Sequence, residues 1–92
     1  MTPNTPDDIR QDLVDLYNDE ELLFADGFDD CIIGVVSGLD IIYRVVYDTG
    51  KMISKLISDG MTAEEAEEYF DFNILGAYVG DRTPLYVNVY EK

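Results

Sequence analysis

The sequence of 92 residues contains no histidine, no tryptophan and one cysteine, Cys31. Without histidine, the Ser-His-Asp and Cys-His arrangements of nucleophilic enzymes are excluded. One cysteine without histidine leaves no zinc site of the usual kind and no intrachain disulfide, which is typical of a chain in a reducing cytosol. Cys31 itself is expected to be a small, buried apolar residue of a strand.

Long apolar runs and phosphate-binding loops are also missing. No apolar stretch approaches the roughly 20 residues that a transmembrane helix needs. The first residues, MTPNTPDD, lack the basic and apolar regions of a signal peptide. Neither a P-loop nor a GxGxxG motif occurs. We therefore expect a cytoplasmic protein that is not an enzyme, binds no cofactor and does not enter a membrane.

Basic residues are scarce, because six Lys and Arg stand against 20 Asp and Glu, giving a formal net charge of −14. The acid is concentrated in two segments. Residues 1–30 contain ten acids and one base, and residues 59–71 contain six acids and no base, whereas residues 31–58 carry a charge of +1. Direct binding to nucleic acid or to an anionic membrane needs a cationic surface, so both are unfavourable.

The first acidic segment is expected to form a helix over residues 6–18, after a loose tail at residues 1–4. Thr5 at the cap, Pro6 at the first helical position and acids in the first turn are typical of a helix start. One side should be a buried apolar stripe, formed by Ile9, Leu13, Leu16 and Tyr17. Another side carries an acidic stripe, formed by Asp8, Asp12, Asp15 and Asp19.

The second acidic segment has the clearest helix signal, because Thr62 and Glu65 have the spacing of a capping box. Asn73 lies on or beside the apolar face of this helix, and it either caps a loop from inside the fold or contacts a ligand or partner. The apolar face is formed by Ala66, Tyr69, Phe70, Ile74 and Ala77. The other faces carry acids with no basic partner in the helix, namely Glu64, Glu67, Glu68 and Asp71.

Between the acidic segments, two apolar runs predict a β-hairpin over residues 31–47. Gly34 within the first run indicates a bulge or a close approach of another part of the chain. Residues 20–25 are ambiguous between a further helical turn and a short edge strand, and an extended conformation is favoured.

A helical pair is expected over residues 49–77, with Asp48 as the first cap and Gly60 between the helices. Residues 85–90 alternate like a half-buried strand. The expected fold is one α+β domain with a small, mainly antiparallel sheet of three to four strands and helices packed on one face. The element order is α-(β)-β-β-α-α-β.

The turn at residues 26–30 contains the one acid cluster to consider for a divalent cation, because three carboxylates flank a glycine. The same pattern is typical of aspartates that bond nearby backbone N–H groups, so no metal is assigned. Composition and core packing do not explain the segment 73–83, and a specific site is expected there, beside this turn. The candidate binding residues are Asn73, Tyr78, Arg82, Asp26, Asp29 and Asp30.

Three segments carry a family resemblance: DGFDDCIIGVV, VVYD at residues 45–48, and GMTAEEAEEYFDFNILGAYVGDRTPLYV. Together they cover roughly residues 26–87 and resemble a family of small proteins from bacteriophage genomes and bacterial prophages. The most specific part is a helix that starts at a methionine and ends in FN-x-x-GAYVG, followed by TP. The resemblance implies a phage accessory origin and brings no catalytic residues with it.

The leading hypothesis is a small phage accessory protein that binds a host protein, for example as an anti-defence inhibitor. Acidic helices can imitate the phosphates of nucleic acid and occupy a basic nucleic-acid-binding groove, although acid also simply raises solubility. The alternative is an oligomer that binds a small ligand such as a nucleotide, or a divalent metal. A homodimer is a further expectation, since a small core and open strand edges favour association.

Overall fold

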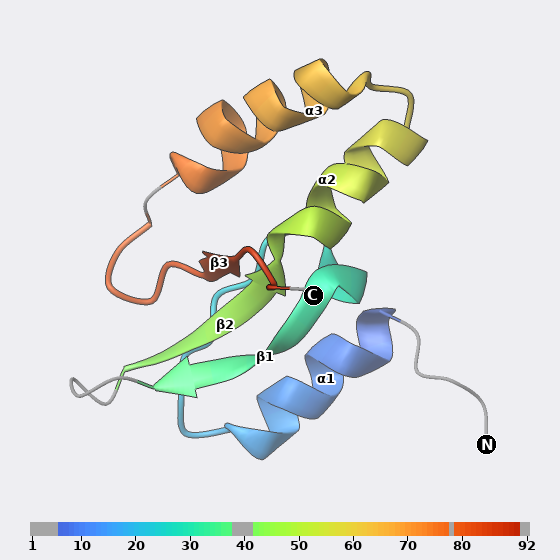
Figure 1. Cartoon of the computed structure of the whole chain (residues 1–92). Helices are drawn as coiled ribbons and strands as arrows, with labels where there is room; N and C mark the ends of the chain where they lie inside the picture. Colours follow the sequence, from blue (N-terminus) through green and yellow to red (C-terminus); the bar gives the residue numbers. More distant parts are fainter. Residues whose placement is uncertain (1–5, 38–41, 78, 91–92) are drawn as a thin grey trace.

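The computed structural model describes residues 6–37, 42–77 and 79–90 of the chain (Figure 1). It confirms the α+β class and the order of helices and strands. The predicted loose tail at residues 1–4 lies outside the described residues. In chain order the elements are helix α1 (Pro6–Leu16), a 3₁₀ turn η1 (Asp29–Cys31), strands β1 (Ile32–Ser37) and β2 (Tyr43–Asp48), helices α2 (Thr49–Ser58) and α3 (Ala63–Tyr69), a π-helical segment η2 (Phe70–Leu75), and strand β3 (Leu85–Val87).

The sheet has β2 as its central strand, antiparallel to β1 and parallel to β3. It is therefore mixed, where the sequence predicted a mainly antiparallel sheet. Parallel neighbours need a long crossover connection, and α2 with α3 supplies it by carrying the chain back before β3 begins. The register of β1 against β2 shifts between Ile32 and Gly34, which confirms the predicted irregularity at that glycine.

Helical side chains pack on one face of the sheet. Tyr47 and Tyr86 lie side by side across the parallel pair with ring centroids 5.8 Å apart, and Phe70 meets Tyr86 edge-on at 5.5 Å. The core cluster is formed by Cys31, Val45, Tyr47, Met52, Leu56, Ala66, Phe70 and Ile74. The opposite face of the sheet is open and aliphatic, with exposed side chains at Ile33, Val36, Leu85 and Val87.

Helix α1 ends at Leu16, two residues before the predicted boundary, and turns through residues 17–19. Leu16 is 74% exposed, so its predicted burial is wrong. The reason is that α1 contacts the fold through η1 and through Tyr17, whose ring lies 5.4 Å from that of Tyr43. Only part of the apolar stripe therefore packs against the rest of the fold. Ile9, Leu13 and Tyr17 in this part are half-buried.

Residues 20–25 form no strand, so the extended segment expected there has no partner in the sheet. Leu22 and Phe24 pack against the core instead. The backbone N–H of Ala25 donates to the hydroxyl of Tyr47 at 2.7 Å. Side-chain packing, this hydrogen bond and the contacts of Arg82 with Glu20 and Glu21 hold the segment in place. At the other end of the sheet, β3 covers Leu85–Val87 rather than the predicted residues 85–90.

Both helices of the pair begin as the sequence predicted. The Asp48 side chain accepts a hydrogen bond from the N–H of Lys51 at 3.1 Å and caps α2. Gly60 follows α2 with φ of 116°, a left-handed conformation that favours glycine. The capping box of α3 is complete, because Thr62 Oγ1 accepts from Glu65 N–H at 3.1 Å and Glu65 Oε1 accepts from Thr62 N–H at 2.9 Å.

Replacing Thr62 with alanine should lower the free energy of unfolding by about 1 kcal/mol, because the N–H of Glu65 loses its acceptor. In a domain of this size that corresponds to a fall in Tm of about 4–8 °C. Thermal unfolding followed by circular dichroism measures it. Thr62→Ser keeps the hydroxyl and should retain most of the stability, and equal melting of Thr62→Ala and the unchanged chain would contradict the role of the cap.

Candidate functional site

The outer side of α3 and η2 carries four exposed acidic side chains, at Glu64, Glu67, Glu68 and Asp71. None of them has a hydrogen-bond or ion-pair partner within the described residues. They stand three and four residues apart, a spacing at which like charges on a helix repel. The four carboxylates are therefore available to an external cation.

The π-helical segment η2 turns apolar side chains toward solvent at the end of this acidic row. The N–H of Gly76 donates to the carbonyl of Asp71 at 3.1 Å, five residues back. Such wide turns are rare and frequently occur at functional sites. Within this segment Phe70 and Ile74 are buried, whereas Phe72 is 80% and Leu75 is 56% exposed. Exposed aromatic and aliphatic side chains of this kind are typical of protein-contact surfaces.

Two shallow hollows lie beside η2 and share Tyr69 and Asn73 as a common wall, and Phe72 lines the first of them. One has a volume of about 350 Å³ and lies along α3, with Met61, Glu65 and Glu68 completing its lining. The other, of about 250 Å³, lies between η2, residues 24–28 and the segment that leads to β3. The second hollow brings Asn73 and Asp26 together. Asn73 is exposed, so it does not cap a loop from inside the fold.

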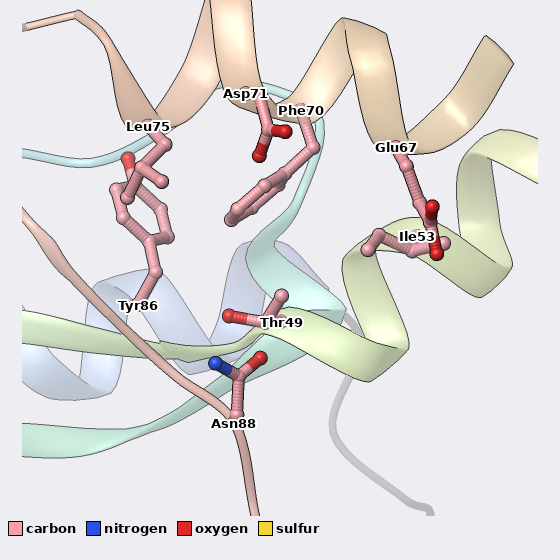
Figure 2. Close-up of a pocket in the computed structure, with 8 residues that line it drawn as sticks. All are labelled: Thr49, Ile53, Glu67, Phe70, Asp71, Leu75, Tyr86 and Asn88. Carbon is pink, nitrogen blue, oxygen red and sulfur yellow. The ribbon is translucent and has the colours of Figure 1, made fainter. Parts of the chain in front are cut away.

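On the other flank of α3 and η2, a pocket of about 250 Å³ opens between this helical segment, α2 and β3 (Figure 2). Phe70 and Tyr86 form its aromatic wall. Glu67 and Asp71 lie above it on the helix, as Figure 2 shows. Thr49, the first residue of α2, lies at its base, and its residue is only 7% exposed. The pocket is completed by Ile53, Leu75 and Asn88.

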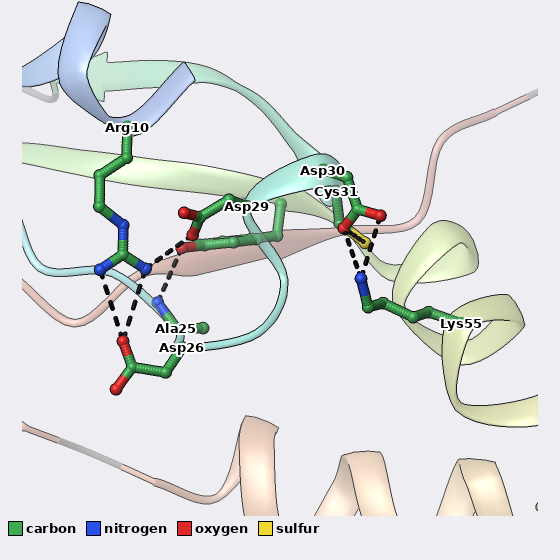
Figure 3. A network of polar contacts seen from close by, with 8 residues as sticks. Arg10, Ala25, Asp26, Asp29, Asp30, Cys31 and Lys55 are labelled. Atoms are coloured by element: carbon green, nitrogen blue, oxygen red, sulfur yellow. Dashed lines mark hydrogen bonds and ion pairs between the residues drawn. The ribbon is translucent and has the colours of Figure 1, made fainter. Parts of the chain in front are cut away.

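The acids of the turn at residues 26–30 are bound by cations of the chain itself (Figure 3). Arg10 Nη2 lies 2.7 Å from Asp29 Oδ1 and 3.4 Å from Asp26 Oδ1, and Lys55 Nζ lies 3.0 Å from Asp30 Oδ2. In the part of the chain that the structure describes, no three His, Cys, Asp or Glu side chains come together as a metal site would require. The turn therefore links α1 and α2 to the core.

The electrostatics of this network keep its groups in their ordinary ionisation states. The hydrogen bond to Asp29 raises the pKa of Arg10 above its usual value, and the bond to Asp30 raises the pKa of Lys55. Burial opposes ionisation of Asp30, but the hydrogen bond and charge of Lys55 lower its pKa overall. Burial, followed by the charge of Asp30, raises the pKa of the Cys31 thiol to about 11. Cys31 is therefore a buried, neutral thiol, as predicted, although it lies in η1 rather than in a strand.

The candidate residue Arg82 also has a partner within the chain. Its Nη1 lies 3.2 Å from Glu20 Oε2 and donates to the carbonyl of Glu21 at 3.4 Å. Arg82 therefore ties the segment before β3 to the segment after α1, and its guanidinium does not line the hollow with Asn73. Tyr78, a further candidate, lies outside the described residues.

The two acidic helices differ in how their charge is compensated. On α1, Asp15 accepts a hydrogen bond from the amide of Gln11 at 3.0 Å, and Arg10 stands in the same helix. Of the predicted acidic stripe, Asp12, Asp15 and Asp19 are exposed, and the side chain of Asp8 lies outside the described residues. Because α3 and η2 contain no basic residue, their face is the more strongly uncompensated of the two.

Comparison of the chain with protein-family models, with curated proteins and with solved structures finds no match. No helix within residues 6–37, 42–77 and 79–90 is long and apolar enough to cross a bilayer. Function is therefore inferred from the side chains and their surroundings.

Sequence reasoning does not single out Phe72, Leu75, Thr49 or Asn88. For Phe72 and Leu75 a signal was present, since both are large apolar residues that fall off the buried face of Ala66, Phe70 and Ile74. For Thr49 and Asn88 there was none. They are brought to one pocket by the parallel pairing of β2 with β3, which no local pattern reveals.

Proposed function

We propose that this chain is a small, non-catalytic phage accessory protein that binds a host protein, with an anti-defence inhibitor as the concrete form. The contact surface is the acidic face, defined as Glu64, Glu67, Glu68, Asp71, Phe72 and Leu75. The observation that carries the proposal is the combination on this face of four carboxylates without partners among the described residues and a phenylalanine that is 80% exposed.

The chemistry of the acidic face selects the kind of partner. Carboxylates along one helix attract a basic groove of the type that binds nucleic-acid phosphates, and the net charge of −14 steers such a partner from a distance. Charge steering alone raises the association rate more than it raises the affinity. Phe72 and Leu75 supply the apolar anchor that a stable contact needs at its centre. The partner surface should therefore combine Lys and Arg with an apolar depression.

The test is affinity capture from a bacterial host lysate with three forms of the full chain. One form is unchanged, one carries Glu64→Gln, Glu67→Gln, Glu68→Gln and Asp71→Asn, and one carries Phe72→Ser. We expect the unchanged chain to retain a basic protein at low salt and to lose most of it at high salt, because screening shortens the reach of exposed charges to about 3 Å at 1 M. Both variants should retain at least about tenfold less, which corresponds to about 1.4 kcal/mol.

The matched control removes the same number of charges elsewhere and carries Asp15→Asn, Asp19→Asn, Glu21→Gln and Asp59→Asn. These side chains are exposed and lie outside the acidic face. The control should capture the same protein as the unchanged chain. Equal loss in the control would show that only total charge matters, and salt-independent capture would rule out an electrostatic contact. Circular dichroism of each variant verifies that the fold is retained.

The alternative, an oligomer that binds a nucleotide or a divalent metal, has less support. The hollow that contains Asn73 also contains the carboxylate of Asp26, and none of its described lining residues is Lys or Arg. A phosphate there would face a negative charge rather than the cations and backbone N–H groups that usually bind it. Arg82 and Lys55, two of the six basic residues of the chain, form ion pairs with Glu20 and Asp30.

A further inference from the structure

The pocket between α2, η2 and β3 has a size suited to one side chain rather than to a cofactor (Figure 2). Its volume of about 250 Å³ lies below the range of roughly 300–1,000 Å³ that is usual for drug-sized ligands. Three kinds of group line it: carboxylates at its rim, neutral polar groups at its base and an aromatic wall. Each kind constrains what the pocket is able to bind.

The carboxylates of Glu67 and Asp71 lie one helical turn apart on the rim. Both are exposed, and no Lys or Arg of the described chain is paired with either of them. Like charges at this spacing destabilise a helix by a few tenths of a kcal/mol. A cation between the two carboxylates would remove that repulsion and gain two charge-assisted hydrogen bonds.

Thr49 offers a further polar group to a ligand in the pocket. The residue is 93% buried, since 7% of its surface is exposed. Its hydroxyl points into the pocket in Figure 2 and has no hydrogen-bond partner among the described residues. Within the described residues, the one buried side-chain N or O atom without a partner is Arg10 Nε, so the Thr49 hydroxyl is open to solvent through the pocket. A donor entering the pocket would satisfy this oxygen, with the side-chain amide of Asn88 beside it.

The wall of the pocket is aromatic and aliphatic. Phe70 is 4% exposed and stands at 87° to the ring of Tyr86. Burial raises the pKa of Tyr86 above its usual value, so its phenol remains neutral and its ring remains a suitable surface for a cation. Ile53 and Leu75 offer apolar surface to the methylene stem of a long basic side chain.

We propose that this pocket receives an arginine side chain of the partner protein, with its guanidinium between the carboxylates of Glu67 and Asp71 and the hydroxyl of Thr49. Arginine fits better than lysine because its planar group presents five N–H donors in a fixed fork. The acceptors lie on different sides of the pocket, so a group with donors in several directions reaches more of them. The inference rests on the proposed function and names the group that the partner inserts. Glu67 and Asp71 belong to both sites, whereas Thr49 belongs to the pocket alone.

The probe is a capped tripeptide, acetyl-Ala-Arg-Ala-amide, titrated into the full-length chain labelled with ¹⁵N and followed by NMR. We expect saturable shifts of the amide signals of Thr49, Tyr86 and Asn88. The same peptide with citrulline in place of arginine has nearly the same shape and no charge. It should bind at least about tenfold more weakly, because hydrogen bonds to charged groups contribute about 1.5–3 kcal/mol.

Variants separate the pocket from general electrostatic attraction. Thr49→Val keeps the shape and removes the hydroxyl, and it should weaken peptide binding about fivefold, whereas Thr49→Ser should bind as the unchanged chain does. Glu67→Gln with Asp71→Asn should weaken binding at least about tenfold. The matched control, Glu21→Gln with Asp59→Asn, removes two exposed charges outside the pocket and should change nothing. Absent binding, equal binding of the citrulline peptide, or equal loss in the control overturns the proposal.

The peptide titration is independent of any host protein, so the two proposals fail separately. Peptide binding at Thr49 without salt-sensitive capture of a host protein would retain the pocket and overturn the proposed function. Capture by the acidic face without peptide binding would retain the function and overturn the arginine pocket.

Discussion

Replacing Phe70 with alanine is expected to lower the free energy of unfolding by about 3–5 kcal/mol, whereas Phe72→Ala should change it by less than about 0.5 kcal/mol. The two residues are of the same type and two positions apart in η2. Phe70 is 4% exposed and meets the ring of Tyr86 at 5.5 Å, and Phe72 is 80% exposed. The first substitution opens a cavity in the core, and the second removes a side chain from water.

The loss at Phe70 is a large share of the total, because domains are stable by only about 5–15 kcal/mol. Urea unfolding and thermal melting should therefore show a fall in Tm of roughly 15 °C or more for Phe70→Ala. Phe70→Leu keeps most of the volume and should cost about 1–2 kcal/mol. Similar melting temperatures for the alanine variants at residues 70 and 72 would contradict the position of η2 against the sheet.

Replacing Arg10 with methionine is expected to cost about 2–4 kcal/mol, because Asp29 would be left buried without its cation. Arg10 Nη2 lies 2.7 Å from Asp29 Oδ1, and Asp29 is 7% exposed. Arg10 also stacks over the ring of Phe24, with 4.6 Å from its guanidinium carbon to the ring centroid. Methionine retains part of the apolar contact, so most of the loss reports the ion pair. Since the Arg10 side chain is 34% exposed, water reduces the cost below that of a fully buried pair.

A double-mutant cycle isolates this pair. Asp29→Asn alone should also destabilise the domain, and the double variant Arg10→Met with Asp29→Asn should recover about 1–3 kcal/mol relative to the sum of the single losses. Urea unfolding of the four proteins gives the coupling energy. Additive losses would show that Arg10 acts through its packing on Phe24 rather than through Asp29. Lys51→Met, at an exposed cation without an ion pair in the described chain, is the matched control and should be nearly neutral.

Local signals in the sequence predicted the elements that depend on local chemistry. The capping box at Thr62, the Asp48 cap, the left-handed Gly60 and the irregularity at Gly34 are all observed. The first three are determined by the residue itself and by neighbours within four positions, and the irregularity at Gly34 reflects the poor fit of glycine in a regular strand. For the same reason the buried positions Ala66, Phe70 and Ile74 of α3 and η2 follow from helical spacing, although Tyr69 and Ala77, predicted on the same face, are exposed.

The parts that depend on distant contacts were not accessible in this way. Arg10 binds Asp29, which is 19 residues away, so no local pattern indicates that the turn at residues 26–30 has a structural role. Arg82 binds Glu20, which is 62 residues away, so no local pattern indicates that its guanidinium is occupied within the chain. The alternation of β3 predicted two faces but not which one is inside. Tyr86 faces the core because its neighbour across the parallel pair is Tyr47.

The parallel pairing of β2 with β3 also determines the order in which the molecule is assembled. Tyr47 and Tyr86 are 39 residues apart, whereas the β1–β2 and α2–α3 pairs join neighbouring elements, and the entropy of closing a loop grows with its length. Because contacts between distant segments carry this extra entropy cost, we expect β3 to dock after the hairpin and the helical pair have formed. It is held by three residue pairs, and weakly held edges open without global unfolding. We therefore expect the pocket of Thr49 and Asn88 to form late in folding, and a ligand that fills it to stabilise the folded chain.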